Sequence, residues 1–124
     1  MTMFIVISPL NPDPMYKQIT DQIKDSIATG ALKPETKLPS IREMAKELKI
    51  SMITIKRAYA DLENEGYILT RSGMGSYIAN INKDKLREEK LKEIRGELNK
   101  IRNTAAKFDI STEDIIRIIK ESGE

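Results

Sequence analysis

One stretch, residues 51–66, limits more than any other what this chain can fold into. Its sequence, SMITIKRAYADLENEG, has the marks of a single helix. Ser51 can accept a hydrogen bond from an amide of the first turn, and Gly66 can end the helix in a left-handed conformation. At about 100° per residue, the side chains fall on two opposite stripes. The core stripe contains Ile55, Ala58, Tyr59 and Leu62, and the outer stripe contains Ile53, Lys56, Arg57 and Ala60.

The outer stripe is unusual for a surface that meets only water, because it combines two cations with an isoleucine near the helix start. This composition indicates a negatively charged partner. Ser51 and Thr54, with free amides at the helix start, suit phosphate oxygens, and Lys56 suits a phosphate or the acceptor pair of a guanine. Ile53 offers methyl groups to a thymine. Burial of Met52 and Ile53 in the core is the alternative interpretation.

A second helix precedes this one closely enough to predict a helix-turn-helix. Ser40 and Glu43 have the spacing of a capping box at its start, and only Lys49 and Ile50 separate the two helices. Arg42 lies in the first turn, where a cation faces the positive end of the helix dipole. Two explanations stay open for Arg42: a carboxylate partner within the chain, or an external phosphate or base edge.

Residues 67–79 predict a β-hairpin behind the helix-turn-helix. Two β-rich runs, 67–71 and 76–79, flank a turn that contains Gly73 and Gly75. A hairpin in this position is a wing.

The N-terminal part of the chain predicts one further helix. It runs from Met15 to Thr29 and ends at Gly30, with Asp13 as N-cap and Pro14 in the first helical position. The apolar run 3–7 predicts a short strand or an extended arm.

The sequence from residue 82 onward is dense in charges of both signs, which is typical of solvated helices. An apolar seam nevertheless recurs at spacings of three and four, and Ser111 can cap a second helix that is apolar on a broad face. These two helices either pack against a partner chain or fold back on the first domain. The seam and the second helix contribute Leu91, Ile94, Leu98, Ile101, Ala105, Phe108, Ile115, Ile116, Ile118 and Ile119.

Composition excludes several classes of function. The 124 residues contain no cysteine and no histidine, so disulfides, Cys/His metal sites and thiol nucleophiles are absent. The chain shows no phosphate-loop or nucleophile-elbow pattern, and we therefore expect neither an enzyme nor a bound cofactor. The run 3–7 is too short for a signal peptide or a membrane span, so a cytoplasmic protein is expected. A net charge of +2 means that any attraction to DNA must come from local placement of cations.

An ordered set of motifs across residues 15–79 resembles the DNA-binding domain of the GntR superfamily of bacterial transcription regulators. The matching residues are Tyr16, Gln18-Ile19, Gly30-Ala31-Leu32, Leu38-Pro39-Ser40-Ile41-Arg42-Glu43, Ser51, Thr54, Ala58-Tyr59, Leu62-Glu63, Glu65-Gly66-Tyr67-Ile68, Arg71 and Gly73-Met74-Gly75-Ser76-Tyr77-Ile78. The resemblance implies a mainly α winged helix-turn-helix domain that binds double-stranded operator DNA as a homodimer. Under the resemblance, the helix 51–65 and the wing 71–76 read an inverted repeat, and repression is the expected outcome.

The resemblance also supplies candidate DNA-binding residues. They are Arg42, Ser51, Met52, Ile53, Thr54, Lys56, Arg57, Arg71, Ser72, Gly73 and Gly75. Two departures from the family pattern stand out. Met52 replaces an arginine that many members have, which removes a guanine-reading fork at that point. Glu35 replaces a glycine, so that the turn after Pro34 is expected to form differently.

The short tail resembles that of the YtrA-type subfamily, in which two helices serve dimerisation. The resemblance divides the chain into a winged domain, 1–81, and a helical dimerisation tail, 82–124. The dimerisation residues are then Leu91, Ile94, Leu98, Ile101, Phe108, Ile115, Ile118 and Ile119. A tail of this size leaves no room for a separate effector domain, so a dedicated small-molecule pocket is not expected. The alternative function is a winged-helix module that binds protein through Met52 and Ile53.

Overall fold

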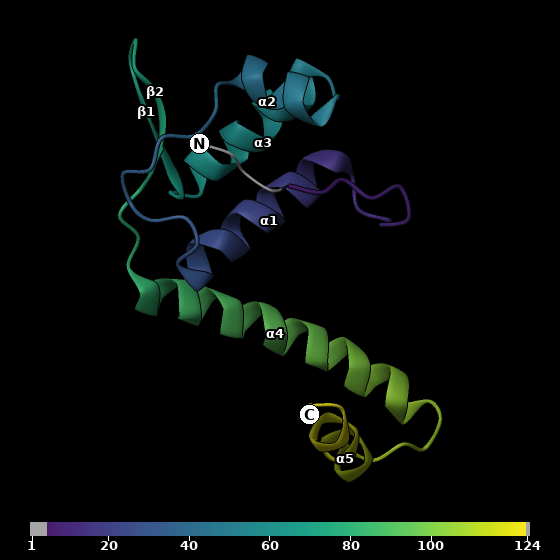
Figure 1. The fold of residues 1–124 in the computed structure, drawn as a ribbon. Coiled ribbons are helices and arrows are strands. Elements are labelled where there is room, and N and C mark those ends of the chain that lie inside the picture. Colours follow the sequence, from purple (N-terminus) through teal and green to yellow (C-terminus); the bar gives the residue numbers. More distant parts are fainter. Residues whose placement is uncertain (1–4, 124) are drawn as a thin grey trace. The chain divides into compact units, whose positions relative to one another are not determined.

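The computed structural model describes residues 5–123, which form five helices and a two-stranded antiparallel sheet (Figure 1). The chain divides into two compact units, with the boundary between Lys83 and Asp84. The fold is mainly α with a small β-hairpin, as predicted. The first unit contains α1 (Met15–Thr29), α2 (Ile41–Leu48), α3 (Met52–Asn64), β1 (Ile68–Arg71) and β2 (Gly75–Ile78), and the second contains α4 (Lys83–Ala106) and α5 (Thr112–Ser122).

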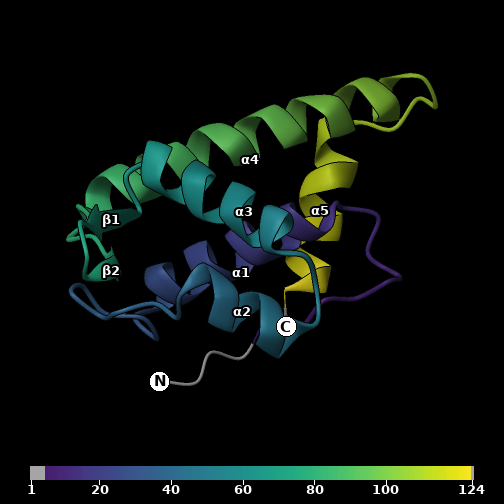
Figure 2. The same ribbon diagram turned by 90° about the horizontal axis from the view of Figure 1, so that it is seen from above.

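The core of the first unit lies between α1, α2, α3 and the hairpin. In Figure 2 the three helices lie together and the hairpin lies at one end of them. The predicted core stripe of α3 is buried in full, and the side chains of α1 that face it are buried as well. The largest fully buried side chains are Ile19, Ile23, Met44, Ile55, Leu62, Ile68 and Ile78. Helical periodicity therefore located the core correctly.

The start of α1 differs from the prediction by one residue. Pro14, at φ −57° and ψ 154°, occupies the N-cap, and no side chain caps the helix. The carbonyl of Pro14 already accepts the amides of Lys17 and Gln18, both at 3.1 Å, so the helix begins after the proline. The backbone carbonyl of Asp13 instead accepts a hydrogen bond from the side-chain amide of Gln18 at 3.0 Å.

Residues 5–8 form an arm without regular secondary structure, so the strand alternative is wrong for them. The amide of Val6 donates to Oε1 of Gln22 at 2.9 Å, and its carbonyl accepts from Nε2 of Gln22 at 2.8 Å. Because these backbone groups are satisfied by a side chain, no strand ladder forms. Ile5 is buried, whereas Met3 and Phe4 lie outside the described residues.

The wing is tied to the loop between α1 and α2. β1 and β2 pair from Ile68↔Ile78 to Arg71↔Gly75. On the other side of β2, the amide of Leu38 donates to the carbonyl of Ser76 and the amide of Ile78 donates to the carbonyl of Thr36, both at 2.8 Å. The loop therefore pairs with β2 through an isolated β-bridge, between Lys37 and Tyr77, and holds the hairpin beside the start of α2.

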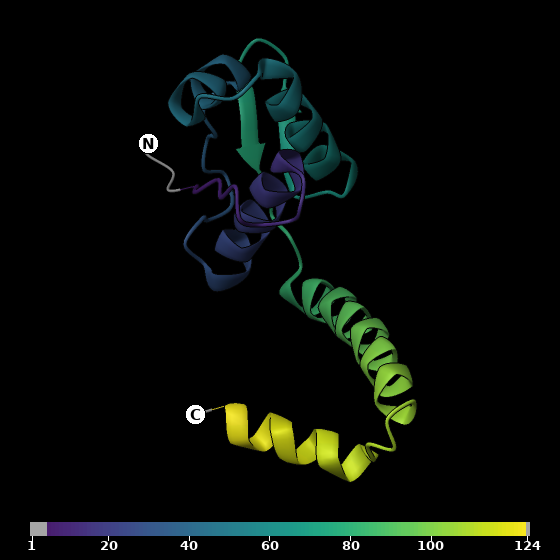
Figure 3. The ribbon, with the colours of Figure 1, turned by 90° about the vertical axis from the view of Figure 1, so that its right-hand side faces the viewer.

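The second unit consists of two helices joined by a tight loop (Figure 3). Asp109 ends the first helix at φ 57°, and the amide of Ile110 donates to the carbonyl of Ala105 at 3.0 Å. Ser111 and Asp114 then form a complete capping box at the start of α5, as the position of Ser111 predicted. Phe108 leaves 71% of its surface exposed.

No helix within residues 5–123 is long and apolar enough to span a membrane. Within the same residues, no cluster of carboxylates is arranged to hold a metal ion.

Candidate nucleic-acid interface

The turn between α2 and α3 fixes the first residues of α3. Lys49 adopts the left-handed conformation at φ 58°, and the amide of Ile50 reaches back to the carbonyl of Ala45 at 3.1 Å. This bond pattern is a Schellman motif with lysine where glycine is usual, at a strain of roughly 1 kcal/mol. The hydroxyl of Ser51 then accepts the amide of Thr54 at 3.2 Å and starts α3, as predicted.

A buried tyrosine connects the two helices of the helix-turn-helix. The hydroxyl of Tyr59 donates to the carbonyl of Pro39 at 2.7 Å and so ties the middle of α3 to the residue before the N-cap of α2. Burial raises the pKa of Tyr59, with a smaller contribution from the nearby charges of Glu43 and Glu47. The hydroxyl therefore stays protonated and remains a donor throughout the physiological pH range.

The outer face of α3 exposes apolar surface at its N-terminal end. Ile53 leaves 81% of its surface exposed and Met52 leaves 49%. Core burial of these two side chains, the alternative interpretation, is therefore wrong. Lys56 is exposed on the same face, one helical turn after Met52.

The polar groups at the start of α3 are less free than expected. The Thr54 amide is used by the Ser51 cap, and the two hydroxyls lie 2.9 Å apart in a hydrogen bond. The expectation of free amides holds only for Met52 and Ile53, whose amides precede the first intrahelical bond. A phosphate at this helix end would meet these two amides and the outer lone pairs of the hydroxyls.

The cations of the helix-turn-helix have unlike surroundings. Arg42 is exposed at the start of α2, and within residues 5–123 no carboxylate forms an ion pair with it. The partner expected under the first explanation for Arg42 is thus not found there. The guanidinium of Arg57 instead stacks on the ring of Tyr16, with 3.7 Å between its central carbon and the ring centroid. This stacking links α3 to the first turn of α1 and holds one cation in a defined place.

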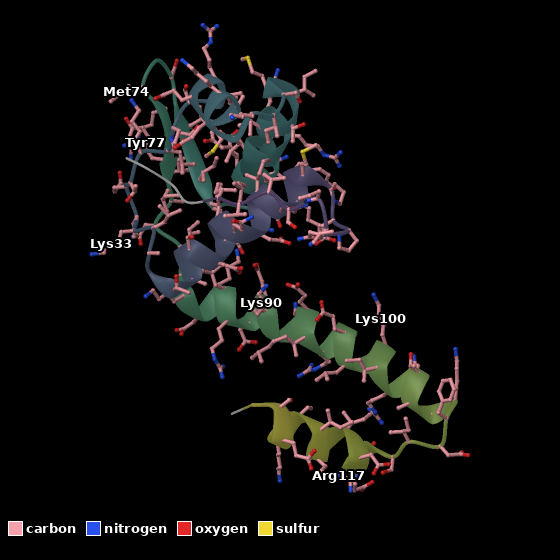
Figure 4. The ribbon with its side chains drawn as sticks, turned by 45° about the vertical axis from the view of Figure 1, so that its right-hand side comes forward. Lys33, Met74, Tyr77, Lys90, Lys100 and Arg117 are labelled. Carbon is pink, nitrogen blue, oxygen red and sulfur yellow. The ribbon has the colours of Figure 1, made fainter. Side chains whose placement is uncertain are left out.

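The wing turn is built from glycines at positive φ. Gly73 has φ 73° and Gly75 has φ 106°, and the amide of Met74 donates to the carbonyl of Arg71 at 2.9 Å. A side chain at Gly75 would also meet Lys37, whose Cε lies 3.1 Å from the position of a Cβ. Met74 lies near the tip of the wing, and Tyr77 lies farther along β2 (Figure 4).

Arg71 at the wing is held by two neighbours. Its Nη2 donates to Oε2 of Glu35 at 2.7 Å, and its guanidinium lies 4.5 Å from the ring centroid of Tyr77. The hydrogen bond to Glu35 and the charge of its carboxylate raise the pKa of Arg71. Of the predicted cations, Arg71 is therefore the one that forms an ion pair within residues 5–123.

Glu35 makes this pair from a left-handed backbone conformation, at φ 71°. The expectation of a different turn after Pro34 is wrong, because glutamate adopts the conformation that suits a glycine. A residue with a Cβ is strained there by roughly 1–2 kcal/mol. The amide of Glu35 nevertheless keeps its bond to the carbonyl of Ile78, at 2.8 Å.

Sequence reasoning missed Tyr16, Glu35 and Tyr77 as neighbours of the candidate cations. Glu35 is 36 positions from Arg71, so local spacing carries no signal of their contact. The substitution of glutamate for the usual glycine was the one sign in the sequence, and it was interpreted only as a change in the turn.

A sequence pattern described as "Bacterial regulatory proteins, gntR family" matches residues 15–78, which run from the start of α1 to the end of β2. The chain belongs to the gntR family. A relative within this family is the HTH-type transcriptional repressor YtrA of Bacillus subtilis, 37% identical over 117 residues, which cover 94% of this chain and 90% of YtrA. The similarity extends through the tail and confirms the resemblance to YtrA-type members. Membership of a regulator family also confirms that the chain is not an enzyme.

Solved structures of similar chains show the same fold. A transcriptional antiterminator from Listeria monocytogenes EGD-e superposes with a TM-score of 0.76 at 32% identity, covering 99% of this chain and 91% of that one. The DNA-binding domain of AraR in complex with operator ORX1 superposes with a TM-score of 0.53 at 29% identity, over 60% of this chain and 92% of AraR's domain. The winged helix-turn-helix of this gntR member is therefore the fold of a DNA-binding transcription regulator.

Proposed function

We propose that the protein is a homodimeric transcription repressor that reads an inverted-repeat operator in the cytoplasm. The observation that carries the proposal is the outer face of α3. A helix locked into the core by its other face exposes Ile53, Met52 and Lys56 side by side. A related domain, that of AraR, is in complex with its operator, and YtrA of B. subtilis is a repressor, which supports both parts of the proposal.

Each candidate residue has a role that follows from its chemistry. Arg42 and the start of α3 at Ser51 and Thr54 would contact phosphates and fix the register of the protein on the duplex. Lys56 would reach a phosphate or a guanine, and Ile53 would contact the methyl group of a thymine in the major groove. Arg57, held by Tyr16, would make a further phosphate contact.

The wing and the residue Met52 complete the interface. Ser72 and Gly73, at the exposed wing turn, would enter the minor groove, with Gly75 allowing the turn its shape and Arg71 beside the backbone. Met52 cannot form the bidentate bonds of an arginine to guanine. Specificity under this proposal is shared among Ile53, Lys56 and the spacing of two half-sites.

The two-helix tail would supply the dimer. Most of its predicted seam is exposed in the single chain, including Leu91, Ile94, Ile101 and Phe108, together with Ile118 and Ile119 of α5. Leu98 and Ile115 are half-buried. Apolar side chains spaced along a long helix favour pairing with a second copy of the chain. Two-fold pairing would set the distance between the two copies of α3, the recognition helix of each chain.

The test begins with selection of bound double-stranded DNA from a random pool. An inverted repeat with a fixed spacing is the expected result. Affinity for the selected DNA should fall steeply with salt, and Lys56→Ala or Arg42→Ala should each lower the salt slope by about one unit. Lys33→Ala, a change of equal charge in the loop after α1, serves as the control.

Selection of a direct repeat or of a single half-site would contradict the dimer geometry. Binding to a protein with no measurable affinity for any DNA would favour the interaction module instead. In the same assay, Ile53→Ala should relax the preference at one base pair of each half-site, worth about 1–3 kcal/mol for a good contact. An unchanged base preference would refute the thymine contact.

A further inference from the structure

We propose that Glu35 is a built-in competitor of DNA phosphate for the guanidinium of Arg71, and that it thereby limits the affinity of the wing for the DNA backbone. The inference rests on the proposed function, since it concerns how tightly the same interface binds. It assigns a role to a residue outside the helix-turn-helix and outside the wing itself.

The geometry makes the competition direct. The carboxylate of Glu35 takes the Nη2 donor of Arg71 at 2.7 Å, and the ring of Tyr77 covers the guanidinium at 4.5 Å. A phosphate oxygen recognises arginine by the same charge-assisted hydrogen bonds that a carboxylate uses. The Glu35 carboxylate occupies one donor of Nη2 and offsets the charge of the guanidinium, so a phosphate that takes the same donor must displace it.

The pair is also exposed enough to exchange partners. The Arg71 side chain leaves 41% of its surface in solvent and the Glu35 side chain leaves 61%. Exposed pairs of this kind are weak and are screened by salt, so a phosphate can displace the carboxylate at small cost. Glu35 can therefore moderate the affinity without preventing binding.

The backbone of Glu35 supports a functional role for the pair. Glutamate holds φ 71° at a position where a glycine would be unstrained, and the strain is not offset by burial, because the side chain is exposed. The stabilisation that an exposed ion pair gives is too small to offset the backbone strain at Glu35. The Glu35 carboxylate thus lies beside the wing despite the strain of its backbone, and it contacts the guanidinium of Arg71 there.

The test compares four proteins on the DNA selected as above, by fluorescence anisotropy over a series of salt concentrations. They are the wild type, Glu35→Gln, Arg71→Ala and the double variant. Glutamine keeps the size and backbone strain of glutamate but removes its charge. Asp25→Asn, at an exposed carboxylate of α1 outside any described ion pair, controls for the change in net charge. Thermal unfolding of each variant verifies the fold.

Glu35→Gln should bind about three- to fivefold tighter than the wild type, because an exposed pair is worth at most that factor. Its salt slope should steepen, because the charge of Arg71 is then no longer offset by the carboxylate beside it. In the Arg71→Ala background the same change should have no effect, and Asp25→Asn should stay close to the wild type.

Weaker binding by Glu35→Gln would overturn the inference and show that the carboxylate positions Arg71 for DNA. A gain that persists without Arg71 would also overturn it, because Glu35 would then repel DNA directly. These outcomes leave the proposed function standing. If the wild type itself shows no salt-dependent DNA binding, the proposed function and this inference are both refuted.

Discussion

Replacing Tyr59 with phenylalanine should destabilise the winged domain by about 1 kcal/mol at pH 7. The change removes the hydroxyl that donates to the carbonyl of Pro39 at 2.7 Å, while the buried ring keeps its packing in the core. A net loss of about 0.5–1.5 kcal/mol is typical of one intramolecular hydrogen bond. Pro39 is half-buried, so that water can partly replace the lost donor and hold the cost near the middle of that range.

The same substitution gives a second, pH-dependent signature. Burial raises the pKa of Tyr59 in the folded protein, whereas in the unfolded chain a tyrosine titrates near 10. Above about pH 10, the unfolded state therefore binds fewer protons than the folded state, and stability falls as pH rises, by up to about 1.4 kcal/mol per pH unit. Only the wild type loses stability in this way, so the difference in free energy of unfolding between it and Tyr59→Phe should vanish at about pH 11.

Urea unfolding at pH 7, 9, 10 and 11, followed by circular dichroism, measures both effects. The other tyrosines and the lysines titrate equally in the two proteins, so the difference between them isolates Tyr59. Tyr59→Leu, which also removes the ring, should cost about 1–3 kcal/mol more because it leaves a cavity. A stability difference between wild type and Tyr59→Phe that stays constant up to pH 11 would refute the buried hydrogen bond.

Three further substitutions test other parts of the structure. Ser40→Ala should lower the free energy of unfolding in urea by about 1 kcal/mol, because it removes the hydroxyl that accepts the Glu43 amide. In the wild type, the Ser40 amide lowers the pKa of Glu43 by donating to its carboxylate. The stabilisation from that second bond should fade as the pH drops below about 4. Gly75→Ala should destabilise the wing by at least about 1 kcal/mol, owing to φ 106° and the nearby Lys37; a cost near zero would contradict this geometry. Ile118→Asp should shift the protein from dimer to monomer in sedimentation velocity, and an unchanged oligomer would exclude the α5 face from the interface.

Most of the fold was predictable because its signals are local. The core stripe of α3, the capping box of Ser40 and the cap at Ser111 each depend on residues within a few positions of one another. Helical periodicity and capping act at this range, so the sequence displays them directly. The one-residue error at the start of α1 reflects the same limit, because proline can occupy either the N-cap or the first helical position.

The sequence displays the residue types of the candidate site but not the partners of its cations. Arg57 and Arg71 have the same chemistry in the sequence, yet one stacks on Tyr16 and the other is neutralised by Glu35. Both partners come from segments far away along the chain: Tyr16 reaches Arg57 because α1 packs on α3, and Glu35 reaches Arg71 because the loop after α1 bonds to β2. Sequence alone likewise could not decide whether Ile53 is buried, since another part of the chain could cover the outer stripe of this helix.

The charge distribution constrains how such a regulator can find its site. With a net charge of +2, the chain as a whole attracts DNA only weakly, and the attraction must come from a few local cations. Arg71 is already paired, whereas the candidate cations Arg42, Lys56 and Arg57 form no ion pair within residues 5–123. Because non-specific binding is almost wholly electrostatic, it should be weak for this protein. Discrimination would then depend on contacts that need a matching sequence, above all that of Ile53, and on two half-sites being occupied together.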